Sequence, residues 1–67
     1  MNEAFKVFYA SCAQDAVRLD DGGQYAYVTG VLRAILNNED LDAVQKVEHA
    51  QFMLGQFDKA WEEHHAV

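Results

Sequence analysis

The chain contains no proline and only four glycines among its 67 residues. Proline breaks helices and glycine weakens them, so a chain with few of either can form long, uninterrupted helices. Hydrophobic residues make up 51% of the sequence, which is too many for a disordered chain despite a net charge of −6. The sequence therefore predicts a single α-helical domain over residues 1–67.

Turn signals divide this domain into three predicted helices, at about residues 3–19, 24–36 and 40–63. Asn2 is a suitable N-cap for the first helix. Two aspartates followed by two glycines, at residues 20–23, predict its end, because acids are unfavourable at a helix C-terminus and glycines allow a turn. Residues 37–40 form the second boundary, where either asparagine can cap the next helix. We expect a small helical bundle with a long C-terminal helix.

Apolar residues recur at helical spacing in all three segments and define the predicted core. This core comprises Phe5, Phe8, Cys12, Leu19, Tyr25, Val28, Leu32, Ile35, Val47, Leu54, Phe57 and Trp61. The central helix is apolar on nearly every side, which is typical of a helix buried between others. Its small residues Ala26, Gly30 and Ala34 recur every fourth position and predict a close contact with another helix. A tolerated glycine without such a role is the alternative.

The third helix carries two apolar surfaces. At 1.5 Å per residue it is on the order of 35 Å long, against about 25 and 20 Å for the other two, so it extends beyond them. Leu41, Val44 and Phe52 lie off its main apolar stripe. Chains of this size form a marginal core, and a second subunit is one way to complete it. We therefore predict that these three residues form an interaction surface, with a homodimer completing the bundle.

No group of residues predicts catalysis, a metal site or a cofactor. Cys12 lies within the apolar stripe of the first helix, where a small core residue is the better interpretation than a reactive thiol. Glu62 and His65 have the spacing used in di-iron bundles, but the pair occurs once and the further glutamates are missing. A helix-turn-helix is disfavoured because Glu39, Asp40 and Asp42 would face phosphates at the start of the would-be recognition helix.

The favoured function is a small acidic module that binds and modulates another protein without catalysis. Its charge disfavours direct nucleic-acid binding and favours a partner with a basic surface. The alternative is an acidic nucleic-acid mimic, like small helical inhibitors from phages and mobile elements, which occupies a DNA- or RNA-binding cleft. The sequence shows no secretory signal and no membrane span, and its lone cysteine favours a cytoplasmic location.

Overall fold

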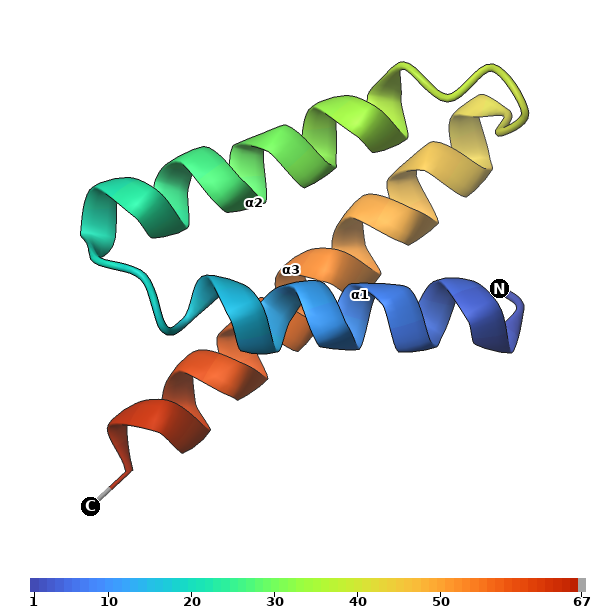
Figure 1. Cartoon of the computed structure of the whole chain (residues 1–67). Helices are drawn as coiled ribbons and strands as arrows, with labels where there is room; N and C mark the ends of the chain where they lie inside the picture. The colour runs from blue at the N-terminus through green and yellow to red at the C-terminus, as the bar shows by residue number, and fades with distance from the viewer. Residues whose placement is uncertain (67) are drawn as a thin grey trace.

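Three α-helices form the fold in a computed structural model that describes residues 1–66. They are α1 (Glu3–Ala16), α2 (Asp21–Leu36) and α3 (Ala43–His65). Helices account for 80% of the structure, and no strand occurs within residues 1–66. The predicted all-α class and the order of three helices with a long C-terminal one are confirmed. In Figure 1, α3 crosses behind α1, whereas α2 lies above α1 in the view and does not cross α3.

The turn between α1 and α2 differs from the prediction. Helix α1 ends at Ala16, and α2 begins at Asp21 instead of residue 24. The Asp20 carboxylate accepts a hydrogen bond from the backbone N–H of Gly23 at 2.7 Å, so Asp20 is the N-cap of α2. A Cβ atom at Gly23 would lie 3.0 Å from the Cβ of Leu19, which explains why a glycine fits here. The acidic run therefore starts α2 rather than ending α1.

Helix α3 begins at Ala43, three residues later than predicted. Asp42 and Gln45 form a reciprocal capping box. The Asp42 carboxylate accepts from the Gln45 backbone N–H at 2.8 Å, and the Gln45 side-chain oxygen accepts from the Asp42 N–H at 2.9 Å. The cap is thus an aspartate, and the two asparagines belong to the preceding loop.

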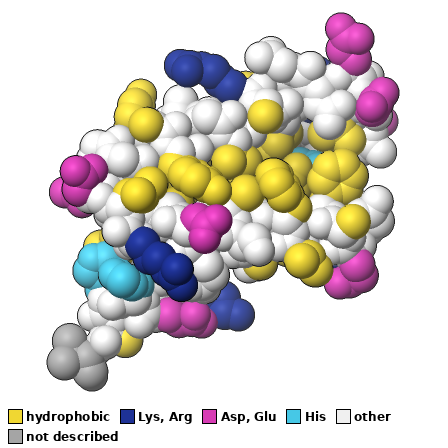
Figure 2. All heavy atoms as spheres, in the orientation of Figure 1, with side chains coloured by type: hydrophobic (Ala, Val, Ile, Leu, Met, Phe, Trp, Pro, Cys, Tyr) yellow, Lys and Arg dark blue, Asp and Glu magenta, His cyan; other side chains and the backbone are white. Residues whose placement is uncertain are grey.

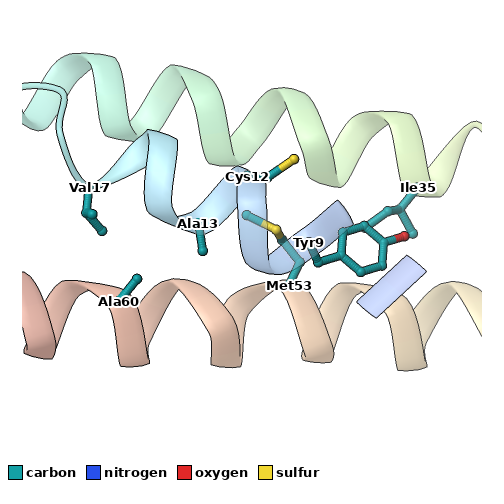
Figure 3. Packing of buried hydrophobic residues seen from close by; sticks show 7 residues of the cluster. All are labelled: Tyr9, Cys12, Ala13, Val17, Ile35, Met53 and Ala60. Carbon is teal, nitrogen blue, oxygen red and sulfur yellow. The ribbon is translucent and has the colours of Figure 1, made fainter. Parts of the chain in front are cut away.

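The core lies where α1 packs against α3, the most extensive helix contact in the molecule. Its buried members are Tyr9, Cys12, Ala13, Val17, Ile35, Met53 and Ala60 (Figure 3). Ala13 of α1 and Val17, the residue that follows α1, point towards Ala60 on α3. Met53 is the largest side chain that is completely buried. Small side chains on both helices thus permit a close approach of the two backbones.

The predicted core is only partly correct. Cys12 and Ile35 are buried, and four other members are half-buried against the core, namely Phe5, Val28, Leu32 and Phe57. The remaining six are 42–74% exposed, so their predicted burial within the chain is wrong; they are Phe8, Leu19, Tyr25, Val47, Leu54 and Trp61. The exposure of the α3 residues follows from how α3 is rotated about its own axis. His49, Met53 and Ala60 face α1, so the side with Val47, Leu54 and Trp61 points outward.

Helix α2 is much less buried than predicted. Ile35 is its only buried residue, and Tyr25 is 74% exposed. The molecule measures 39 × 23 × 15 Å and exposes 4683 Å². A compact monomer of this mass exposes about 4,300 Å². None of the helices within residues 1–66 combines the length and apolar character that crossing a membrane requires.

Candidate protein-binding surfaces

An open apolar groove runs between α1 and α2. It has a volume of about 410 Å³. Its walls and floor are formed by Phe5, Phe8, Tyr9, Ala26, Tyr27, Gly30, Val31, Ala34, Ile35 and Asn38. Figure 2 shows the matching band of hydrophobic side chains between the two helices. None of these ten residues carries a charge at neutral pH, so an occupant of the groove must itself present an apolar surface.

The small residues of α2 form one wall of this groove. Ala26, Gly30 and Ala34 are all exposed and all line it. A Cβ atom built at Gly30 would meet nothing within 4 Å. The predicted close helix contact at Gly30 is therefore absent within the described chain. The row instead leaves room for a helix that approaches from outside.

A buried hydrogen bond fixes the floor of the groove. The Tyr9 hydroxyl and His49 Nδ1 are 2.7 Å apart, and His49 is only 4% exposed. The Phe5 ring packs edge-on against the His49 ring, with 4.5 Å between their centroids. Burial raises the pKa of the Tyr9 hydroxyl, with a smaller contribution from Cys12. Tyr9 thus remains a neutral phenol at physiological pH and can hold the imidazole of α3 beneath the groove.

The pairing of Tyr9 and His49 is the feature that the sequence did not reveal. The two residues are separated by 40 positions, and His49 stands alone in its segment. The only available signal was its position one turn before Met53, on the side of α3 that proved to face α1.

Tyr27 connects the groove to the thiol of Cys12. Burial raises the pKa of the Tyr27 hydroxyl, and so do its neighbours Cys12 and Asp15. Cys12 itself is a free, buried cysteine that is 5% exposed. The structure thus places Cys12 in the core, where a substrate cannot reach its sulfur without local unfolding.

The residues predicted to form the interaction surface do not lie together. Leu41 and Phe52 are half-buried and pack against the core. The Phe52 ring centroid is 6.2 Å from that of Tyr9. Val44 alone is freely exposed, at 68%. Leu41 and Phe52 are therefore less available to a partner than predicted, because Phe52 packs against Tyr9 of α1 and Leu41, in the loop before α3, packs against the core.

The apolar surface left free on α3 is the stripe that had been assigned to the core. Val47, Leu54 and Trp61 are 56%, 42% and 43% exposed. Tyr25 of α2 lies beside this stripe, because it lines a shallow pocket together with Leu54. Leu36 follows Tyr25 by eleven residues, which returns it to nearly the same side of α2, and it is 58% exposed. We call these five residues the α2–α3 face.

The C-terminal turn of α3 shows a local arrangement instead of a metal site. The His65 Nδ1 is 2.8 Å from the Trp61 carbonyl oxygen, and the two rings stack with centroids 3.9 Å apart. Within residues 1–66, no group of three or more potential ligand side chains is placed to hold a metal ion. The Glu62–His65 spacing is therefore not part of a larger ligand set in the described structure.

Comparisons of this chain with protein-family models, with curated proteins and with solved structures find no match. The two apolar surfaces, the groove between α1 and α2 and the α2–α3 face, are therefore the candidate binding sites of this chain.

Proposed function

We propose that this chain is a small protein-interaction module that binds and modulates another protein without catalysing a reaction. The observation that carries the proposal is the open apolar groove between α1 and α2. Its occupant is an amphipathic helix of the partner protein, a common mode of recognition in which apolar side chains of a helix fill a hydrophobic groove.

The wall formed by Ala26, Gly30 and Ala34 supports a helical occupant. Small residues at four-residue spacing let two helix backbones approach closely. The opposite wall carries Phe5 and the 55%-exposed Phe8, which offer large apolar contacts. Aromatic anchors of this kind contribute strongly to protein interfaces. The groove therefore combines a flat wall for backbone contact with a bulky wall for side-chain contact.

Electrostatics narrows the chemistry of the partner. The chain carries a net charge of −6, whereas the groove residues are uncharged. A partner helix with an apolar face flanked by lysine or arginine would be attracted over a distance and then held by apolar contacts. Such a partner would bind more weakly as salt screens the attraction.

The nucleic-acid mimic remains the second candidate, and the placement of three of the eleven acidic residues argues against it. Asp20 and Asp42 are engaged as helix caps. Glu3 lies 3.8 Å from Lys6 in an exposed ion pair. A mimic needs carboxylates in a regular, phosphate-like array, and these three serve local structure instead.

We also propose that the protein is cytoplasmic, a location that its single free thiol favours.

The test is a groove-filling variant with a matched control. Gly30→Leu puts a bulky side chain into the groove, where nothing lies within 4 Å of the new Cβ, so the fold should tolerate it. Gly55→Leu makes the same change at another exposed helical glycine with open space around it, and Gly55 does not line the groove. Any host protein captured by the wild-type chain is purified, and its affinity for each variant is measured by calorimetry.

We expect Gly30→Leu to weaken binding by about tenfold or more, since overpacking of a contact is costly. Gly55→Leu should bind like the wild type. Equal binding by both variants would exclude the groove as the site. If, in addition, DNA or RNA competed for the same partner, the mimic would become the better explanation.

A further inference from the structure

The α2–α3 face is separate from the groove. It comprises Tyr25, Leu36, Val47, Leu54 and Trp61, none of which lines the groove. The groove is bounded by the side of α2 that carries Ala26, Gly30 and Ala34. A partner helix in the groove therefore leaves the α2–α3 face exposed to water, and an exposed apolar patch marks a candidate interaction site.

The spacing of residues on α3 is symmetric. Val47 lies seven residues before Leu54, and Trp61 lies seven residues after it. Residues seven apart return to nearly the same side of a helix, so these three side chains form one row along α3. When two such helices run antiparallel and cross at Leu54, Trp61 of each comes opposite Val47 of the other. A large side chain then meets a smaller one at both ends of the contact.

We infer that a second copy of this chain covers the α2–α3 face, in a two-fold symmetric dimer whose α3 helices cross antiparallel near Leu54. Two-fold dimers use the same patch on both subunits, so the patch must be complementary to itself. The arrangement of Val47, Leu54 and Trp61 meets this requirement. Tyr25 and Leu36 extend the contact onto α2.

The area available is sufficient for such a dimer. The exposed parts of the five side chains amount to roughly 500 Å² per copy, or about 1,000 Å² in total. A specific interface buries at least about 1,000 Å² in total. Backbone and flanking side chains add to this area. The dimer would also cover surface that this elongated monomer exposes beyond the value for a compact one.

Charge gives this dimer a signature that differs from that of a basic partner. Each copy carries a net charge of −6, so the two copies repel each other at long range. Added salt screens this repulsion and should tighten the dimer. Binding of a basic partner in the groove should weaken under the same conditions. The two interactions therefore respond to salt in opposite directions.

The experiment uses the single tryptophan of the chain as a native probe. Trp61 is the only tryptophan and lies in the proposed contact. Sedimentation equilibrium of the full chain from about 5 to 500 µM should show a monomer–dimer transition that salt strengthens. Over the same range the Trp61 emission should move to shorter wavelength as water leaves the indole. A chain that remains monomeric throughout would overturn the inference and leave the face for a different protein.

The variants test the location of the contact. Leu54→Glu and Val47→Glu place carboxylates in the contact and should raise the dimer dissociation constant by about tenfold or more. Val7→Glu is the control, because Val7 is 63% exposed on α1 and belongs to neither surface. Circular dichroism checks that each variant folds. A dimer that survives both α3 variants, or one that Val7→Glu dissociates equally, would show that the contact lies elsewhere.

This inference does not rest on the proposed function. Leu54→Glu leaves the groove intact, and Gly30→Leu leaves the α2–α3 face intact. A failure of self-association would not exclude a partner helix from the groove. Conversely, loss of groove binding in Gly30→Leu would not exclude the dimer.

Discussion

Replacing Gly30 with alanine should stabilise the fold by about 1 kcal/mol. Glycine in a helix interior is less favourable than alanine by about that amount, because the unfolded chain gains more freedom at glycine. The gain is realised only where the new methyl group fits, and at Gly30 nothing lies within 4 Å of the Cβ position. In a domain of this size 1 kcal/mol raises the melting temperature by roughly 4–8 °C.

Two other glycines provide the comparison that makes this prediction sharp. Gly55 of α3 also has nothing within 4 Å, so Gly55→Ala should give a similar gain. A Cβ at Gly23 would lie 3.0 Å from the Cβ of Leu19 and 3.1 Å from the capping carboxylate of Asp20. Gly23→Ala should therefore be neutral or destabilising. The three variants thus distinguish the general preference of helices for alanine over glycine from the space available for a methyl group at each position.

Thermal unfolding followed by circular dichroism, at one fixed protein concentration, measures all three variants. The concentration must be fixed because self-association makes the melting temperature concentration-dependent. If Gly30→Ala melted below the wild type while Gly55→Ala melted above it, the Ala26–Gly30–Ala34 row would have to be packed against another helix. The open groove, and the function proposed for it, would then be wrong.

Three further changes probe the core and a cap. Met53→Ala should cost about 2–5 kcal/mol in urea denaturation, because Met53 is completely buried, and this loss approaches the stability of a domain so small. Tyr9→Phe should cost about 1–3 kcal/mol, because it leaves His49 Nδ1 buried without its partner. Burial raises the pKa of Tyr9 in the folded state above its ordinary value of 10.0. The neutral hydroxyl therefore contributes to the free energy of unfolding, and this contribution is lost as the pH rises above 10. Tyr9→Phe should reduce the loss of stability that alkaline denaturation curves show. Asp42→Ala should cost about 1 kcal/mol through loss of the α3 cap, and unchanged stability would contradict the capping box.

The helices could be predicted because their signals are local. The lack of proline, the apolar periodicity and the cap at Asn2 specify three helices without reference to tertiary structure. The boundary errors arose from aspartates that act as caps. Asp20 begins α2, although the acidic run there was interpreted as the end of the first helix. Asp42 begins α3, although one of the two asparagines was expected to cap it.

The rotation of α3 could not be predicted because both of its sides are apolar. The side with Val47, Leu54 and Trp61 carries larger hydrophobic residues, so a count of hydrophobicity favours it as the core face. The structure buries the other side, where His49 and Ala60 appear poor core residues in isolation. Their burial depends on distant residues of α1, namely the hydroxyl of Tyr9 and the small side chain of Ala13. The structure thus leaves Val47, Leu54 and Trp61 exposed and half-buries Phe52, the reverse of what was predicted for these four residues.

Helix α2 takes part in both proposed contacts, so its local stability should report on both of them. One side of α2 lines the groove, and Tyr25 and Leu36 on the other belong to the α2–α3 face. Only Ile35 of α2 is buried, whereas α1 and α3 are buried against each other. Segments with few buried contacts open locally at lower free energy than the rest of a fold.

Amide hydrogen exchange at low concentration should therefore show faster exchange in α2 than in the centres of α1 and α3. Raising the concentration should slow exchange in α2 in the wild type but not in Leu54→Glu, because the second copy covers Tyr25 and Leu36. A partner helix should slow α2 again in both proteins. The second copy and the partner helix both bind to α2, and each of them stabilises its helical state. Binding of one should therefore favour binding of the other. If the amides of α2 were protected from exchange as strongly as those of α1 in the dilute monomer, this coupling would be contradicted. Helix α2 would then already be fully stable, and neither binding event could stabilise it further.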